Sequence, residues 1–116
     1  MRIGVDLGGT KIAFVRLADA GHVDARFRVA TPREDYAACI EAIADGVERL
    51  EAGTGGRCTV GVGTPGSVVQ ASGCMKNCNS TWLNDRPLPA DLARRLDRPV
   101  AAASRDHGAV RRHART

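Results

Sequence analysis

Three polar side chains surround a glycine pair near the amino terminus: Asp6, Thr10 and Lys11 lie around Gly8 and Gly9. The backbone N–H groups of a glycine turn can form a concavity that fits phosphate oxygens. A hydroxyl and an ammonium group beside it add hydrogen-bond donors, and a carboxylate at the strand end suits hydrated Mg²⁺. These residue types predict a phosphate-binding turn with a magnesium-supporting carboxylate.

A plain hairpin turn is the alternative interpretation of the same residues. Two glycines between strands more commonly make an ordinary turn than a phosphate site. The spacing matches neither the Walker A pattern nor G-x-G-x-x-G, so those two nucleotide-binding folds lose support. From these residues alone, both interpretations stay open.

A second polar group surrounds the single tryptophan, Trp82. Its members are small amide and hydroxyl side chains: Asn77, Asn79, Ser80, Thr81 and Asn84. Amides donate and accept hydrogen bonds at once, which matches the paired hydroxyls of a sugar. A solvated loop with Trp82 as a packing anchor explains the same residues equally well.

Composition predicts one globular domain. The chain has 116 residues, 43% hydrophobic and 26% charged, which is ordinary for a soluble protein with a buried core. No apolar run approaches the ~20 residues that a membrane span needs, and the first strand begins without a preceding leader. We therefore expect no membrane partner and a cytoplasmic location.

The cysteines and the basic charge favour neither a metal site nor nucleic-acid binding. Of the four cysteines only Cys74 and Cys78 lie close in sequence, and the three histidines are scattered, so reduced thiols are expected rather than zinc ligands. The formal net charge is +4, but most of it belongs to the tail at residues 104–116. A near-neutral body predicts no nucleic-acid partner.

Alternating apolar residues predict that a strand precedes the glycine turn, with Ile3, Val5 and Leu7 on one face. Residues 12–17 form a second strand and residues 22–30 a third, joined by connections short enough to make them antiparallel. The glycine pair is thus expected at a hairpin between the first two strands.

Two helices and two further strands follow. Thr31 as a hydroxyl cap, Pro32 at the first helical position and Glu34 after them predict a helix start, and its apolar stripe continues to Leu50. Residues 58–63 form a strand parallel to the first; residues 87–96 form a second helix and residues 99–103 a last strand.

The turn Thr64-Pro65-Gly66-Ser67 closely follows the strand at residues 58–63. In open α/β sheets, ligands bind at the carboxyl ends of the strands. This placement makes Pro65 and Gly66 candidates for the same site as the glycine turn.

This order of elements resembles the opening of the actin-like, ribonuclease-H-like ATPase fold. Residues 6–11 resemble the phosphate motif of the ROK group of repressors and sugar kinases, and residues 31–33, 62–67 and 76–84 agree with that group in the same order. The last stretch is most similar to bacterial fructokinases. The implied fold is an α/β amino-terminal lobe with a mixed sheet, antiparallel first strands and packed helices, over residues 1–103.

The resemblance implies transfer of the ATP γ-phosphoryl group to a sugar hydroxyl with Mg²⁺. It places Gly8, Gly9, Thr10 and Lys11 at the nucleotide phosphates, and it has Asp6 support the metal through water. The sugar-binding positions it implies are Pro65, Gly66, Asn77, Asn79, Ser80 and Thr81.

The resemblance fails after residue 103. Such kinases carry Asn-Asp-x-Asn there, with the aspartate as base; this chain has Ser104-Arg105-Asp106-His107, with Asp106 one place late. The family's second lobe and its zinc motif have no counterpart in the sequence. We expect an amino-terminal lobe fragment from a truncated or frame-shifted coding sequence, with weak or no turnover and an off-family tail at residues 104–116.

Two hypotheses follow from the resemblance. The first is a fructokinase-type ATP:hexose kinase lobe. The alternative is a non-catalytic sugar-binding module or a relative of the glucokinases and N-acetylglucosamine kinases. The group's repressors carry a DNA-binding segment before the glycine motif, and this sequence has none. The oligomeric state stays open, with a homo-oligomer among the alternatives.

Overall fold

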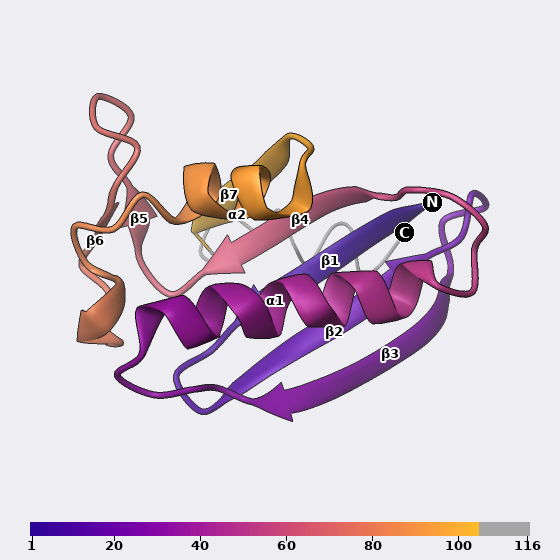
Figure 1. Ribbon diagram of the computed structural model, residues 1–116, viewed down its shortest axis with the longest axis horizontal. Coiled ribbons are helices and arrows are strands. Elements are labelled where there is room, and N and C mark those ends of the chain that lie inside the picture. Colours follow the sequence, from indigo (N-terminus) through magenta and orange to yellow (C-terminus); the bar gives the residue numbers. More distant parts are fainter. Residues whose placement is uncertain (105–116) are drawn as a thin grey trace.

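The main structural element is one mixed sheet of five strands (Figure 1). The structure, a computed structural model, describes residues 1–104 of the chain. The strands of the sheet are β1 (Arg2–Leu7), β2 (Lys11–Leu17), β3 (Val23–Ala30), β4 (Thr59–Thr64) and β7 (Val100–Ser104). Their order across the sheet is β3-β2-β1-β4-β7, so β1 lies at the centre.

Strand directions confirm the predicted hairpins and crossover. β1 pairs antiparallel with β2, which pairs antiparallel with β3. β4 and β7 run parallel to β1. The carboxyl ends of β1, β4 and β7 therefore lie at one end of the sheet, which we call the site end, and their amino ends lie at the other. Ser104 still belongs to β7.

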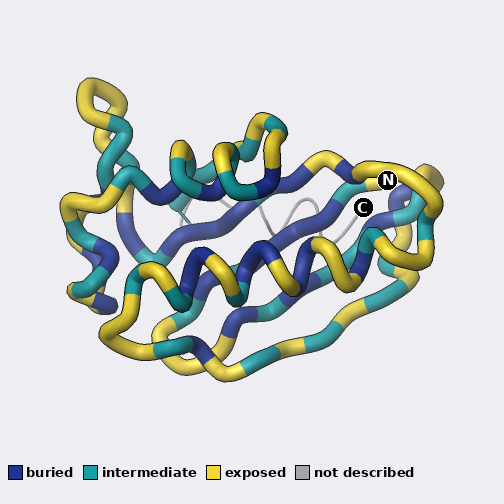
Figure 2. The backbone as a smooth tube through the Cα atoms, viewed as in Figure 1, coloured by how far each residue is buried: buried dark blue, intermediate teal, exposed yellow. Residues whose placement is uncertain are grey.

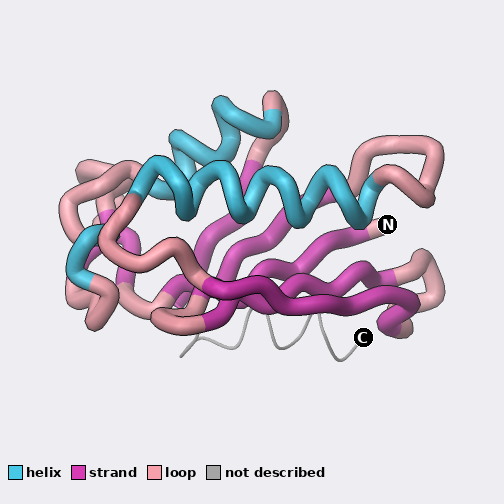
Figure 3. The backbone as a smooth tube through the Cα atoms, turned by 60° about the horizontal axis from the view of Figure 1, so that its bottom comes forward, coloured by secondary structure: helices cyan, strands magenta, loops and turns pink. Residues whose placement is uncertain are grey.

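Two helices cover one face of the sheet, α1 (Tyr36–Glu51) and α2 (Leu88–Leu96) (Figure 3). The predicted alternation of β1 is confirmed, because Ile3, Val5 and Leu7 are all buried. Buried residues concentrate along the central strands and the inner stripe of α1 (Figure 2). None of the helices in residues 1–104 is long and apolar enough to cross a membrane.

Close packing of α1 on the sheet depends on a glycine. A Cβ atom built at Gly46 would overlap the ring of Phe14 on β2. Phe14 is fully buried and stacks on Phe27 of β3, with ring centroids 4.8 Å apart. The helix thus accepts a residue of low helix propensity because the ring needs that space.

The predicted helix start at Thr31 is wrong. α1 begins at Tyr36, and Asp35 is its cap, with the carboxylate accepting a 3.0 Å hydrogen bond from the N–H of Ala38. Glu34 has φ 59°, in the left-handed region, so it cannot be part of the helix. The Thr31 hydroxyl does not cap the helix, because it donates a long-range hydrogen bond to the carbonyl of Gly8 instead.

A small excursion follows β4 at the site end (left in Figure 1). Its elements are the hairpin β5 (Ser67–Val68) and β6 (Met75–Lys76) and the short helix η1 (Thr81–Leu83). Met75 and Leu83 are buried, and the indole of Trp82 packs against the core. This contact supports a packing role for Trp82, which was one of the two interpretations that the sequence left open.

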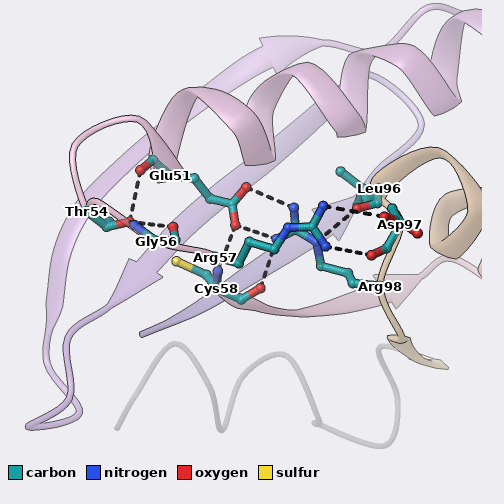
Figure 4. Close-up of polar contacts among 8 residues, drawn as sticks. All are labelled: Glu51, Thr54, Gly56, Arg57, Cys58, Leu96, Asp97 and Arg98. Atoms are coloured by element: carbon teal, nitrogen blue, oxygen red, sulfur yellow. Dashed lines mark hydrogen bonds and ion pairs between the residues drawn. The ribbon is translucent and has the colours of Figure 1, made fainter.

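The opposite end of the sheet is held by an ion pair between Glu51 and Arg98 (Figure 4). Both side chains are largely buried, at 12% and 11% exposure. The Glu51 carboxylate also accepts a 2.7 Å hydrogen bond from the N–H of Cys58, and the Arg98 guanidinium donates to the Cys58 carbonyl at 2.9 Å. We call this the Glu51–Arg98 cluster; it ties the end of α1 to the start of β4 and the end of α2.

Candidate functional site

The glycine turn lies between β1 and β2 at the site end. The N–H of Gly8 donates a 3.0 Å hydrogen bond to the carbonyl of Lys11. A Cβ atom at Gly8 would lie only 2.7 Å from that carbonyl oxygen, so a side chain there would force the turn open. Gly9, Thr10 and Lys11 are exposed, which leaves the turn accessible to a ligand.

Thr31, which directly follows β3, stabilises this turn through hydrogen bonds. Its hydroxyl donates a 2.8 Å hydrogen bond to the carbonyl of Gly8, and its backbone N–H donates a 2.9 Å bond to the carbonyl of Thr10. In a trans peptide the carbonyl and the following N–H point in opposite directions. Holding the Gly8 carbonyl toward Thr31 therefore directs the Gly9 N–H away from Thr31.

Asp6 is half-buried near the end of β1. Its cross-strand neighbours, Ala13 on β2 and Gly63 on β4, are both small. This geometry fits the predicted support of a hydrated metal next to the glycine turn.

The described residues supply few protein ligands for a metal. No group of three or more His, Cys, Asp or Glu side chains in residues 1–104 could hold an ion. Mg²⁺ commonly takes only one or two carboxylates and completes its shell with water and substrate phosphates. A single carboxylate near the glycine turn fits Mg²⁺ that would be brought in with a nucleotide.

The Pro65-Gly66 turn packs directly on the segment that follows β6. A Cβ atom at Gly66 would lie 2.7 Å from the Cys78 sulfur and 2.9 Å from the Cys78 nitrogen. The buried Thr64 hydroxyl steadies the turn by donating a 2.8 Å hydrogen bond to the Gly66 carbonyl. The structure thus brings together the two stretches that the sequence predicted to face a sugar.

Within the loop at residues 77–81, hereafter the polar loop, three of the predicted sugar-binding side chains face solvent. Asn77, Asn79 and Thr81 are exposed, whereas Ser80 is 5% exposed. Asn77 has φ 59°, a left-handed conformation that Asn tolerates better than most residues. Amide and hydroxyl groups are therefore available at the surface of the loop.

Asn84 has a different role from its polar neighbours. Its side-chain oxygen accepts a 2.9 Å hydrogen bond from the Cys78 N–H, and its amide nitrogen donates to the Cys78 carbonyl at 3.3 Å. Both ends of the amide are used on the backbone. Asn84 therefore shapes the polar loop rather than offering its amide to a ligand.

Two buried thiols lie among these elements. Burial raises the pKa of the Cys78 thiol and, together with smaller effects of its neighbours, that of Cys39. The thiolate is the nucleophilic form, so these shifts favour the less reactive thiol form. No disulfide links any of the four cysteines, all of which lie in residues 1–104.

The glycine turn and the polar loop meet at Ser80. A Cβ atom at Gly9 would lie 3.4 Å from the Ser80 hydroxyl oxygen. The two predicted half-sites, one for phosphate and one for sugar, therefore lie close together. The base candidate Asp106 lies outside the described residues, as does nearly all of the tail predicted at residues 104–116.

Sequence reasoning missed Thr31 as a site residue. Its local pattern, a hydroxyl before proline, matched a helix cap, and nothing local indicates a partner on the β1–β2 turn. Two signals were usable: residues 31–33 agree with the ROK group, and Asp35 also lies at cap spacing before the apolar stripe of α1.

Comparison with known proteins gives the chain a family. The model of the ROK family matches residues 2–109. An N-acetyl-D-glucosamine kinase from Vibrio cholerae is 41% identical over 100 residues, covering 86% of this chain and 33% of that protein. An N-acetylgalactosamine kinase, AgaK, from a Shewanella strain is 38% identical over 101 residues, covering 87% and 32%.

Solved structures agree with this relationship. A ROK family glucokinase from Streptomyces griseus, in complex with glucose and AMPPNP, superposes with a TM-score of 0.77 at 29% identity. The match covers 89% of this chain and 32% of that one. The chain thus spans about a third of the length of the relatives it matches, and its fold is the amino-terminal portion of the actin-like ATPase fold. It belongs to the ROK family.

Proposed function

We propose that this chain provides the phosphate-binding and sugar-binding lobe of an ATP-dependent sugar kinase. The observation that carries the proposal is the proximity of Gly9 and Ser80, whose hydroxyl oxygen lies 3.4 Å from where a Cβ of Gly9 would stand; it places a phosphate-type turn beside a loop of amides and hydroxyls. A phosphoryl donor and a hydroxyl acceptor must be held next to each other for transfer. ATP and a sugar meet in the cytoplasm, which is the location we propose.

Each side of the contact has a role in this proposal. Residues Gly8, Gly9, Thr10 and Lys11 surround the nucleotide phosphates: the Gly8 N–H closes the turn on the Lys11 carbonyl, the Gly9 N–H and the Thr10 hydroxyl donate hydrogen bonds, and Lys11 contributes positive charge. Mg²⁺ held near Asp6 would neutralise charge on the transferred group. On the acceptor side, Pro65 and Gly66 back the polar loop while Asn77, Asn79 and Thr81 donate to and accept from sugar hydroxyls.

Proton removal from the acceptor hydroxyl needs a carboxylate. Asp106 is the candidate because it follows β7 closely, and β7 ends at the site end of the sheet. Its displacement by one place from the ROK pattern leads us to propose weak turnover for the 116-residue chain. Asp106→Asn should abolish whatever sugar-dependent ADP release the chain shows, while sugar affinity stays unchanged.

The acceptor has three candidates. N-acetylhexosamines come first, because several N-acetyl-D-glucosamine kinases are 36–41% identical over 100 residues. Fructose comes second, because residues 76–84 resemble the corresponding loop of bacterial fructokinases. A glucose acceptor is the third arm of the test, given the glucokinase among the similar structures.

Calorimetric titration of the chain with N-acetylglucosamine, N-acetylgalactosamine, fructose, glucose and mannose distinguishes these acceptors. We expect one sugar to bind at least tenfold more tightly than the others, a difference of about 1.4 kcal/mol. Thr81→Ala should weaken that binding, whereas Ser72→Ala, in the β5–β6 hairpin, should leave it unchanged. Failure of all five sugars to bind at millimolar concentration would overturn the sugar-site assignment.

A non-catalytic sugar-binding module is the second candidate function. It is favoured by the displaced Asp106 and predicts sugar binding without nucleotide binding. Titration with AMPPNP and Mg²⁺ separates the two, since only the kinase lobe should bind the nucleotide at the glycine turn. Sugar binding together with no AMPPNP binding would replace our proposal by this one.

A further inference from the structure

Ser80 is a nearly buried hydroxyl without an internal partner. The residue is 5% exposed, yet its side chain takes part in none of the hydrogen bonds or other polar interactions among residues 1–104. Its carbonyl caps η1 by accepting a 3.0 Å bond from the Leu83 N–H. The hydroxyl oxygen itself is not fully shielded from solvent, so a ligand that binds at the glycine turn can reach it.

The position of this hydroxyl limits which ligand group could be its hydrogen-bond partner. Its oxygen lies 3.4 Å from the place where a Cβ of Gly9 would stand, on the exposed part of the turn. Thr31 holds the Gly8 carbonyl on the far side of the same peptide, so the Gly9 N–H is directed away from Thr31. A ligand on the turn beside Gly9 therefore lies within reach of the Ser80 hydroxyl.

The other polar side chains of the polar loop differ from Ser80. Asn77, Asn79 and Thr81 are exposed, as expected for residues that meet a hydrated sugar from solvent. Ser80 alone among them is buried against the phosphate-type turn. The exposed neighbours of Ser80 are thus suited to bind the sugar. Ser80 is placed to bind the phosphoryl group that is transferred from the nucleotide to the sugar.

We propose that the Ser80 hydroxyl donates a hydrogen bond to the phosphoryl group being transferred. This inference rests on the proposed kinase function and revises the sequence-based placement of Ser80 at the sugar. The ligand class is a phosphate monoester or terminal phosphate: the γ-phosphoryl of the nucleotide before transfer and the phosphate of the sugar after it. No bond to Ser80 forms or breaks, and the residue acts as a fixed donor to charge on the equatorial oxygens.

Ser80→Ala tests the proposal without a folding penalty. Because the hydroxyl has no internal partner, its removal leaves no orphaned group, and alanine fits the same space. A hydrogen bond to a charged phosphate predicts a loss of affinity of about ten- to a hundredfold. A hydroxyl that only stabilised the loop would instead lower the thermal unfolding temperature.

Four ligands should be titrated by amide NMR, each with Mg²⁺: AMPPNP, ADP, a hexose 6-phosphate and the free hexose. We expect Ser80→Ala to weaken AMPPNP and the hexose phosphate, and to leave ADP and the hexose unchanged. The matched control is Ser72→Ala, which removes a hydroxyl from the β5–β6 hairpin and should change none of the four.

Each other outcome overturns the inference in a recognisable way. An equal loss of ADP affinity would place Ser80 at the inner phosphates, and an equal loss for the free hexose would return it to the sugar. Unchanged affinity for all four ligands would remove its role while leaving the kinase proposal intact. A wild-type chain that binds none of the ligands overturns both proposals together.

Discussion

The two ends of the sheet are built from opposite kinds of interaction. At the site end, neutral hydroxyls and amides hold the turns through hydrogen bonds to the backbone, as Thr31 does for Gly8 and Asn84 does for Cys78, and the ion pair between Lys76 and Asp85 is exposed. At the other end, the Glu51–Arg98 cluster ties three elements with a largely buried ion pair. Under the proposed function the contrast separates two tasks, since the site end would bind ligands and the other end holds the lobe together.

The largest effect on stability is expected at the Glu51–Arg98 cluster. Glu51→Gln leaves a largely buried guanidinium without its counter-charge and should lower the free energy of unfolding by about 3 kcal/mol. Urea unfolding measures it. Nucleotide and sugar affinities of the folded variant should be unchanged.

The control for this variant is Glu41→Gln. Glu41 also pairs with an arginine, Arg95, at 3.0 Å, but the glutamate is 56% exposed. Surface ion pairs contribute little, so the control should unfold like the wild type. Equal destabilisation by both variants would refute the distinction between a buried and an exposed pair.

Gly66→Ala should have the next largest effect, this time at the site end. Its new methyl would overlap the backbone of residues 76–78, and overpacking of this kind costs about 1–3 kcal/mol. Because the polar loop must move to relieve the overlap, sugar affinity should fall along with stability.

Gly73→Ala is the comparison variant for this position. No atom lies within 4 Å of a Cβ there, although its φ of +71° adds some backbone strain. It should lose stability without losing sugar affinity. Unchanged sugar binding in Gly66→Ala would show that the turn does not shape the acceptor site.

A smaller and more specific effect is expected for Thr31→Val. This change removes the hydroxyl bond to the Gly8 carbonyl but keeps the backbone bond to Thr10. We expect AMPPNP affinity to fall about tenfold, since one hydrogen bond contributes about 1 kcal/mol and its loss also releases the Gly9 N–H. Thr31→Ser should restore the affinity; if it does not, the hydroxyl is not the positioning group.

The Glu51–Arg98 cluster should also make the stability of the protein depend on pH. Burial disfavours the Glu51 carboxylate, but hydrogen bonds from Arg98 and Cys58 outweigh it and hold its pKa below the ordinary value of 4.5. The stability contributed by this group is therefore fully present above that value and is lost as the pH falls through the folded-state pKa.

Unfolding free energies of the wild type and Glu51→Gln should accordingly converge as the pH is lowered below about 4.5. Urea titrations between neutral and acid pH measure the convergence. A difference that stayed constant down to the acid limit would mean that Glu51 does not titrate in the folded protein as described.

Local patterns predicted the strands and α2 well because each element depends on its own periodicity. Leu88, Leu92 and Leu96 lie four apart and are all buried. The start of α1 was wrong because Thr31 prefers a partner on a distant turn. A local pattern contains no information about that partner.

The candidate site was predicted residue by residue but not as an assembly. Residue types identified the glycine turn and the polar loop, whereas the Gly9–Ser80 contact depends on how the chain returns after β6. The Glu51–Arg98 pair spans 47 residues, and neither residue belongs to a recognisable motif. Long-range pairing of this kind is set by the packing of α1, β4 and α2 together.

The most direct test of the two-ended account is an amide NMR map of the chain with AMPPNP and Mg²⁺. We predict that ligand addition changes the amide chemical shifts of Gly8, Gly9 and Ser80 most, while those of Cys58 and Arg98 stay unchanged. Shift changes centred on the Glu51–Arg98 cluster, or spread evenly over the sheet, would contradict the assignment of the phosphate site to the glycine turn.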